Sequence, residues 1–122
     1  MIKFYRTDHK VLSEITEYED NMWVCMTKPT VDETKLIAED FEIDLADVRA
    51  ALDDEESSRV EVEDGYTLIL VDIPSIEMRN EREAYTTIPL GIILVKDILI
   101  TVCAEDTPVL DAFIESKVKE FS

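Results

Sequence analysis

The fold is decided by residues 59–104, which read RVEVEDGYTLILVDIPSIEMRNEREAYTTIPLGIILVKDILITVCA. The dipeptide Asp64-Gly65 separates two strand-like runs. It is the pair that a two-residue hairpin favours, because glycine accepts the positive φ of a primed turn. Lys96-Asp97 stands between two apolar runs in the same way, although without a glycine. Four strands joined largely by short connections predict an antiparallel sheet.

The inner strands of this stretch are apolar at nearly every position. They read LILV at 68–71, IILV at 92–95 and ILI at 98–100. A strand with this composition is buried on both faces. The centre of the sheet therefore needs cover above and below, which predicts a three-layer arrangement of helix, sheet and helix. The expected fold class is α/β, with a mixed and largely antiparallel sheet.

The outer strand of the stretch alternates instead. Val60 and Val62 fall on one side and Glu61 and Glu63 on the other, so one face of this strand is expected to meet water. Between the inner strands, residues 77–83 form a polar gap that reads as a flexible connection.

The residues before this stretch predict three more strands, at 2–6, 10–15 and 22–26. A helix then begins at Thr30, because Thr30-Val-Asp-Glu33 is a capping box: the hydroxyl and the Glu33 carboxylate each accept a hydrogen bond from an orphan amide. Asp44 caps a second helix, whose apolar residues recur at three- and four-residue spacing up to Leu52. These two helices are expected to cover one face of the sheet.

A third helix is expected at the end of the chain. Thr107-Pro108 marks its start, since proline at the first helical position loses no hydrogen bond. One helix covers the second face only in part, so the second helical layer is incomplete in these residues. Either two copies pack together or the chain is the front part of a longer protein. The second explanation is favoured, because the helix is still periodic where the sequence ends.

The net charge of −17 over 122 residues is the extreme property of this chain. It argues against binding to nucleic acid, which requires lysine and arginine to neutralise phosphates, and against anionic membrane surfaces. An acidic protein attracts cations, although solubility is the simpler reading of the charge. No apolar run approaches the ~18–20 residues that span a bilayer, and no signal peptide opens the chain. Two distant cysteines predict buried free thiols, and hence a cytosolic protein.

Catalytic motifs are absent from the sequence. It has one histidine and two glycines, with no phosphate-binding loop and no nucleophile arrangement, so we expect no enzyme activity. Gly91, inside a strand, indicates a bulge or close packing. Acidic runs at 17–20, 53–56 and 77–83 offer oxygen ligands, although a solvated surface explains each run as well. Magnesium leaves no sequence signature, because it needs only one or two carboxylates.

Six short motifs follow one another along the chain in an order that resembles a known protein family. The motifs are Leu52-Asp53-x-Glu55-Glu56, Arg59-Val60-Glu61, Glu63-Asp64-Gly65-Tyr66, Val71-Asp72-Ile73-Pro74, Pro89-Leu90-Gly91-Ile92 and Ile98-x-Ile100-Thr101-Val102. In this order they resemble the amino-terminal cytosolic domain of the CorA family of magnesium and related divalent-cation transporters. The Pro29-Thr30 and Thr107-Pro108 helix starts fit the same pattern.

The resemblance implies a larger parent protein. Family members are pentamers with a cytosolic funnel, a long stalk helix, two membrane helices and a Gly-Met-Asn motif at the pore. None of the last three occurs here, so residues 1–122 are expected to form a single partial domain that does not conduct ions by itself. The whole protein would sit at the cytoplasmic face of the membrane, attached through missing C-terminal helices. The fragment would be soluble, with dimers as another possible assembly.

The resemblance also implies a regulatory metal site. In the family, divalent ions bound between neighbouring cytosolic domains hold the channel closed, and one ligand is an acid near the connection after the central strand. Here Glu77 is the nearest match, with Asp72 and Glu81 as further candidates and Mg²⁺ as the ligand. The implied function is divalent-cation sensing and pentamer gating. The alternatives are a stand-alone acidic protein-interaction module and the equivalent domain of a zinc-transporting relative.

Overall fold

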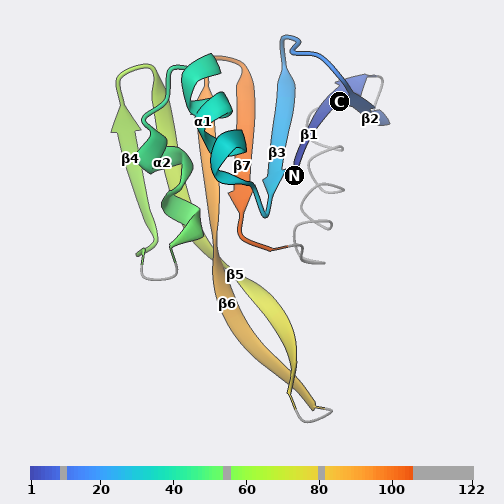
Figure 1. Ribbon diagram of the computed structural model, residues 1–122, viewed down its shortest axis with the longest axis vertical. Coiled ribbons are helices and arrows are strands. Elements are labelled where there is room, and N and C mark those ends of the chain that lie inside the picture. The colour runs from blue at the N-terminus through green and yellow to red at the C-terminus, as the bar shows by residue number, and fades with distance from the viewer. Residues whose placement is uncertain (9–10, 54–55, 80–81, 106–122) are drawn as a thin grey trace.

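The computed structural model describes residues 1–8, 11–53, 56–79 and 82–105 (Figure 1). The described elements alternate between strands and short helices. In chain order they are β1 (Ile2–Asp8), β2 (Val11–Ile15), β3 (Met22–Thr27), α1 (Val31–Asp40), α2 (Leu45–Val48), the 3₁₀ helix η1 (Ala50–Leu52), β4 (Arg59–Glu63), β5 (Tyr66–Arg79), β6 (Arg82–Val95) and β7 (Ile98–Cys103). The predicted C-terminal helix from Thr107 lies outside the described residues.

All seven strands form one sheet in the order β2-β1-β3-β7-β6-β5-β4. Neighbouring strands are antiparallel except β3 and β7, which run parallel from Trp23↔Leu99 to Thr27↔Cys103. The predicted mixed, largely antiparallel α/β fold is therefore confirmed. Both predicted turns are present: Gly65 has φ 93° between β4 and β5, and Lys96 has φ 54° between β6 and β7.

The helices α1, α2 and η1 pack on one face of the sheet, above its larger apolar core (Figure 1). Ile37 of α1, Val48 of α2, and Ile93 and Ile100 of the inner strands are fully buried there. At Gly91 a Cβ atom would lie 3.1 Å from the Cβ of Ala51 in η1. Close packing of a helix on the sheet, one of the two predicted alternatives, thus explains this glycine.

The opposite face of the sheet carries a smaller cluster of buried residues, made of Trp23, Cys25, Leu90, Leu99 and Cys103. Both cysteines are free and buried, as predicted. Towards the β4 edge this face is open, with Val60, Val62 and Leu94 exposed by 65%, 80% and 44%. Among the described residues, the second layer of cover is therefore incomplete, in line with the sequence analysis.

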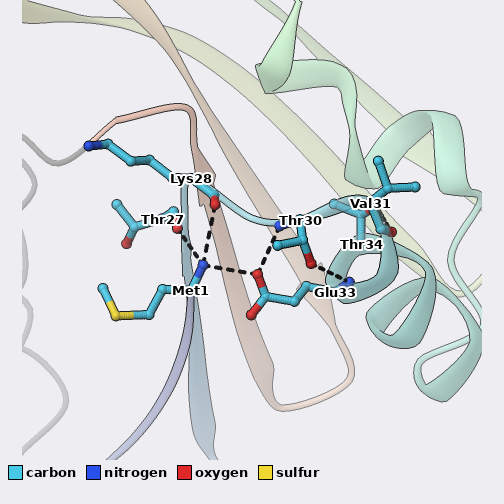
Figure 2. A network of polar contacts seen from close by, with 7 residues as sticks. All are labelled: Met1, Thr27, Lys28, Thr30, Val31, Glu33 and Thr34. Carbon is cyan, nitrogen blue, oxygen red and sulfur yellow. Dashed lines mark hydrogen bonds and ion pairs between the residues drawn. The ribbon is translucent and has the colours of Figure 1, made fainter.

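The predicted capping box of α1 is present (Figure 2). The Thr30 hydroxyl accepts a hydrogen bond from the Glu33 amide at 3.1 Å, and the Glu33 carboxylate accepts one from the Thr30 amide at 2.8 Å. Asp44 caps α2 as expected, accepting from the Ala46 amide at 3.0 Å.

The prediction of one helix up to Leu52 is wrong in its length. The backbone of Arg49 (φ −90°, ψ −3°) ends α2, and the chain continues as the tighter 3₁₀ turn η1.

Residues 77–79 and 82–83, which were expected to form a connection, belong to strands instead. Strands β5 and β6 pair from Thr67↔Leu94 to Arg79↔Arg82 and form a long ribbon that projects from the sheet (Figure 1). Pro74 and Pro89 lie within these strands, although proline has no backbone N–H to donate. However, Pro74 lies beyond the β4 pairing, which stops at Leu70, and Pro89 lies just before the β7 pairing, which starts at Leu90. Proline is tolerated in a strand with an unpaired edge.

No helix within the described part of the chain is both long enough and apolar enough to cross a membrane.

Candidate cation-binding site

Three carboxylates converge at the β4 edge of the sheet. Asp47 of α2 and Glu61 and Glu63 of β4 each offer an oxygen, and these oxygens lie within 4.8 Å of one another. We call this group the acidic cluster. Asp47 and Glu61 are half-buried, whereas Glu63 is exposed. These are the described residues whose geometry best suits a bound cation.

The register of β4 explains why its acids meet α2. Glu61 pairs with Leu68 and Glu63 with Tyr66 of β5. Leu68 and Tyr66 belong to the core under the helices. Paired residues share a face of an antiparallel sheet, so the glutamates also face α2. One face of β4 meets water, as expected. The strongly exposed side chains on that face are the two valines, Val60 and Val62.

Two of the three carboxylates already accept hydrogen bonds. The Tyr66 hydroxyl donates to Oδ2 of Asp47, and it accepts from the Asp44 amide at 3.3 Å. Burial, followed by the bond to Asp47, raises the pKa of Tyr66 to about 12. Tyr66 therefore stays neutral and remains a donor at ordinary pH.

Arg59 places a positive charge in direct contact with the cluster. Its Nε donates to Oε1 of Glu61 at 2.6 Å, and its Nη1 donates to Glu56. The arginine offsets part of the repulsion among the acids. A metal ion that bound Glu61 would therefore compete with a guanidinium group that is already in place.

The ligand atoms of the cluster are all oxygens. Carboxylate oxygen is the ligand that Mg²⁺, Ca²⁺ and Mn²⁺ prefer, whereas zinc sites usually include histidine or cysteine. Magnesium keeps several of its waters and needs only one or two protein carboxylates. The geometry therefore suits a partly hydrated, hard divalent cation.

The site residues implied by the family resemblance lie elsewhere. Asp72 is exposed on β5 and accepts a hydrogen bond from the Ser58 hydroxyl at 3.2 Å. It stands four positions beyond Leu68, which is about 13 Å along a strand. Glu77 is five positions further along β5, opposite Ala84, rather than in a connection. Glu81 lies outside the described residues. The structure does not bring Asp72 or Glu77 together with the acidic cluster.

Sequence reasoning missed the acidic cluster because its members are scattered. Asp47 reads as an ordinary acid in the first turn of a helix, and Glu61 and Glu63 read as the wet side of an edge strand. The available signal was the hairpin register: the Asp64-Gly65 turn places Glu61 opposite Leu68, an inner-strand residue. That register would have turned the glutamates towards the helices.

Comparison with known proteins shows the family to which the chain belongs. The fold is that of soluble domains of divalent-cation transporters, and the sequence profile described as "CorA-like Mg2+ transporter protein" matches residues 18–119. The chain therefore belongs to the CorA-like Mg²⁺ transporter family. A search of curated proteins gave no match.

Solved structures show the same fold at low sequence identity. The soluble domain of CorA from Methanocaldococcus jannaschii matches with a TM-score of 0.75 and 21% identity, covering 100% of this chain and 47% of that one. The complete CorA magnesium transporter of the same organism matches with a TM-score of 0.72 and 16% identity, and the match covers 98% of this chain and 37% of that one. The ZntB cytoplasmic domain of Vibrio parahaemolyticus RIMD 2210633 matches with a TM-score of 0.67 and 15% identity, and the match covers 97% of this chain and 49% of that one. This chain thus spans less than half the length of each of these chains.

Proposed function

We propose that this chain is the cytosolic regulatory domain of a CorA-like divalent-cation transporter, and that it senses divalent cations through surface carboxylates. The family match over residues 18–119 carries the proposal. In the whole protein the domain would assemble with further copies, as a pentamer, at the cytoplasmic face of the membrane. Transport itself would be performed by the rest of the protein.

The charge of the domain supports a sensing role. Copies that each carry −17 repel one another, so a bound divalent cation stabilises an assembly of such domains. When the cation concentration falls, the repulsion returns and a second arrangement becomes favoured. A ligand shifts such an equilibrium only by its difference in affinity for the two states. Several weak sites around a ring can together supply that difference.

The acidic cluster is the place in this domain where we expect such a cation to bind. Its three oxygens lie within 4.8 Å of one another, which is close enough for one hydrated ion to contact more than one of them. The expected affinity is weak, because the cluster is partly exposed and Arg59 already neutralises Glu61. Asp72, Glu77 and Glu81 remain candidates for a site completed by a neighbouring copy.

A zinc-transporting relative is the second candidate, since the ZntB cytoplasmic domain shares the fold. The all-oxygen cluster favours magnesium over zinc as the sensed ion, because zinc prefers nitrogen and sulfur ligands. The sensed ion and the transported ion are separate questions, and the cluster addresses only the first.

The test is an amide chemical-shift titration of the ¹⁵N-labelled chain with MgCl₂, ZnCl₂ and NaCl at matched ionic strength. We expect MgCl₂ to give saturable shifts centred on residues 45–48 and 61–66, with NaCl giving small and diffuse ones. The double variant Glu61→Gln/Glu63→Gln should lose the saturable shifts. The matched control, Glu39→Gln/Glu42→Gln, removes two exposed charges near the end of α1 and should retain them.

Two results would contradict the sensing role at this position. One is identical behaviour of MgCl₂ and NaCl, which would reduce the effect to charge screening. The other is saturable binding that survives in Glu61→Gln/Glu63→Gln, which would place the ion elsewhere.

A further inference from the structure

The two cysteines of the chain lie on the same face of the sheet, on neighbouring strands. Cys25 belongs to β3 and Cys103 ends β7, and these strands pair in parallel, side by side in Figure 1. Both thiols are buried, with exposures of 4% and 0%, in the smaller cluster opposite the helices, together with Trp23. The sequence contains no other cysteine or tryptophan.

The register of β3 and β7 places the two thiols diagonally. Cys25 pairs with Thr101, and Cys103 stands two positions after Thr101. Residues two positions apart on a strand share a face, so both side chains project from the same side. Neighbouring strands lie about 4.8 Å apart and two residues span about 6.6 Å, so the two Cα atoms are about 8 Å apart.

A hydrogen bond on this face shows that side chains with the same diagonal offset meet. Trp23 pairs with Leu99, and its Nε1 donates to Oγ1 of Thr101, two positions further along β7, at 3.0 Å. The offset from Trp23 to Thr101 equals the offset from Cys25 to Cys103. The diagonal between the thiols is therefore within the reach of side chains in this pair of strands.

The separation of the cysteines is too long for a disulfide and suits a metal bridge. A disulfide joins Cα atoms about 4.4–6.8 Å apart, with about 2.05 Å between the sulfurs. A metal ion placed between the sulfurs, with two collinear bonds of about 2.3 Å, widens that separation to about 4.6 Å. The bridge gains roughly 2.5 Å of reach, which is enough to span the diagonal.

The buried surroundings of the thiols decide which kind of ion fits. Burial is the main reason why the pKa of the Cys103 thiol is raised, so this thiol keeps its proton until a metal ion displaces it. Two thiolates cancel the charge of a divalent ion, and a neutral product suits an apolar site. A monovalent ion would leave a buried negative charge, which is costly. Thiolates select soft ions, whereas magnesium prefers oxygen ligands.

We propose that Cys25 and Cys103 form a two-thiolate site for a soft divalent metal ion that accepts two ligands, as Hg²⁺ does. Binding forms two metal–sulfur bonds and releases the two thiol protons to water. The bridge fastens β3 to β7 near the C-terminal ends of both strands, where local opening admits the ion. The site lies on the face opposite to the acidic cluster. This inference is independent of the proposed cation sensing.

The first test is a titration of the reduced chain with HgCl₂ in the presence of glutathione as a competing thiol. The fluorescence of Trp23, which shares the cluster with both thiols, reports occupancy of the site. We expect quenching that saturates at one ion per chain. Cys25→Ser and Cys103→Ser should each bind about a hundredfold more weakly, because a second thiolate held in place acts at a high effective concentration. Glu61→Gln/Glu63→Gln, which changes the opposite face, should bind like the wild type.

A second test uses the wild-type chain alone, so it does not depend on the folding of a variant. Native mass spectrometry of the complex without glutathione should show one ion gained and two protons lost per chain. X-ray absorption at the mercury edge should show two sulfur neighbours for each ion. Two ions per chain with one protein sulfur each, no uptake by the folded chain, or equal affinity in Cys25→Ser and the wild type would overturn the proposal.

Discussion

The two faces of the sheet differ in what covers them, and β4 shows the difference within five residues. On the helix-covered face, its glutamates meet Asp47 of α2 and form the acidic cluster. On the opposite face, Val60 and Val62 stand 65% and 80% exposed. The glutamates thus lie on the side of the helices, where Glu61 is half-buried, and the valines lie on the open side. In β4, the register with β5 that the Asp64-Gly65 turn fixes decides which side chains face the helices.

The largest expected effect separates the faces at two adjacent residues of β6. Ile93 is fully buried under the helices, whereas its neighbour Leu94 points to the other face and is 44% exposed. We expect Ile93→Ala to lower the free energy of unfolding by about 3 kcal/mol, because a cavity remains under the helices. Leu94→Ala should cost under about 1 kcal/mol. Urea unfolding of both variants measures the difference, and equal losses would show that the two faces are equally covered.

The next effect concerns association through the open face. We expect the isolated chain to form dimers or larger species at high concentration, because Val60, Val62 and Leu94 leave apolar surface in contact with water. Val60→Thr/Val62→Thr keeps residues that favour strands and should weaken association about tenfold, while the free energy of unfolding changes little. Sedimentation velocity over a concentration series measures this. A wild-type chain that stays monomeric throughout, or a variant that associates equally well, would contradict it.

The smallest effect tests the covered face through Tyr66. An unfolded tyrosine has a pKa of about 10, and in the folded chain the pKa of Tyr66 is raised to about 12. The folded state thus holds this proton more tightly. Its contribution to stability is complete below pH 10 and is lost as the pH rises towards 12. The Tm difference between wild type and Tyr66→Phe should therefore shrink over that range, with one late tyrosinate transition missing at 295 nm in the variant. A difference that stays constant from pH 9 to 12 would argue against the Asp47 contact.

Much of this fold could be predicted from local sequence patterns. The capping box at Thr30, the turn at Asp64-Gly65 and the strand runs 68–71 and 92–95 each depend on neighbours a few residues away. The expectation that these runs are buried on both faces is wrong at Leu94, which is 44% exposed. The length of the β5–β6 ribbon could not be predicted, because tolerance of Pro74 and Pro89 depends on where β4 and β7 stop pairing. That is a property of the assembled sheet.

The candidate site was harder to predict for a related reason. Asp47 and the β4 glutamates are separated by 14 or more residues, and only the packing of α2 against the β4–β5 register brings them together. Asp72 and Glu77 were proposed from family resemblance, and the structure places them further along β5. A site completed by a second copy cannot be read from one chain, whereas a cluster inside one domain follows once the sheet order is known.

The most direct test of the central claim is the Tm of the chain in MgCl₂ and in NaCl at matched ionic strength. At a magnesium concentration equal to the dissociation constant, a single site adds about 0.4 kcal/mol to stability, or about 2 °C in Tm. We predict a Tm that is higher in MgCl₂ by this amount for the wild type and for Glu39→Gln/Glu42→Gln, and no difference for Glu61→Gln/Glu63→Gln. Equal stabilisation of the wild type by the two salts would contradict cation sensing by this domain.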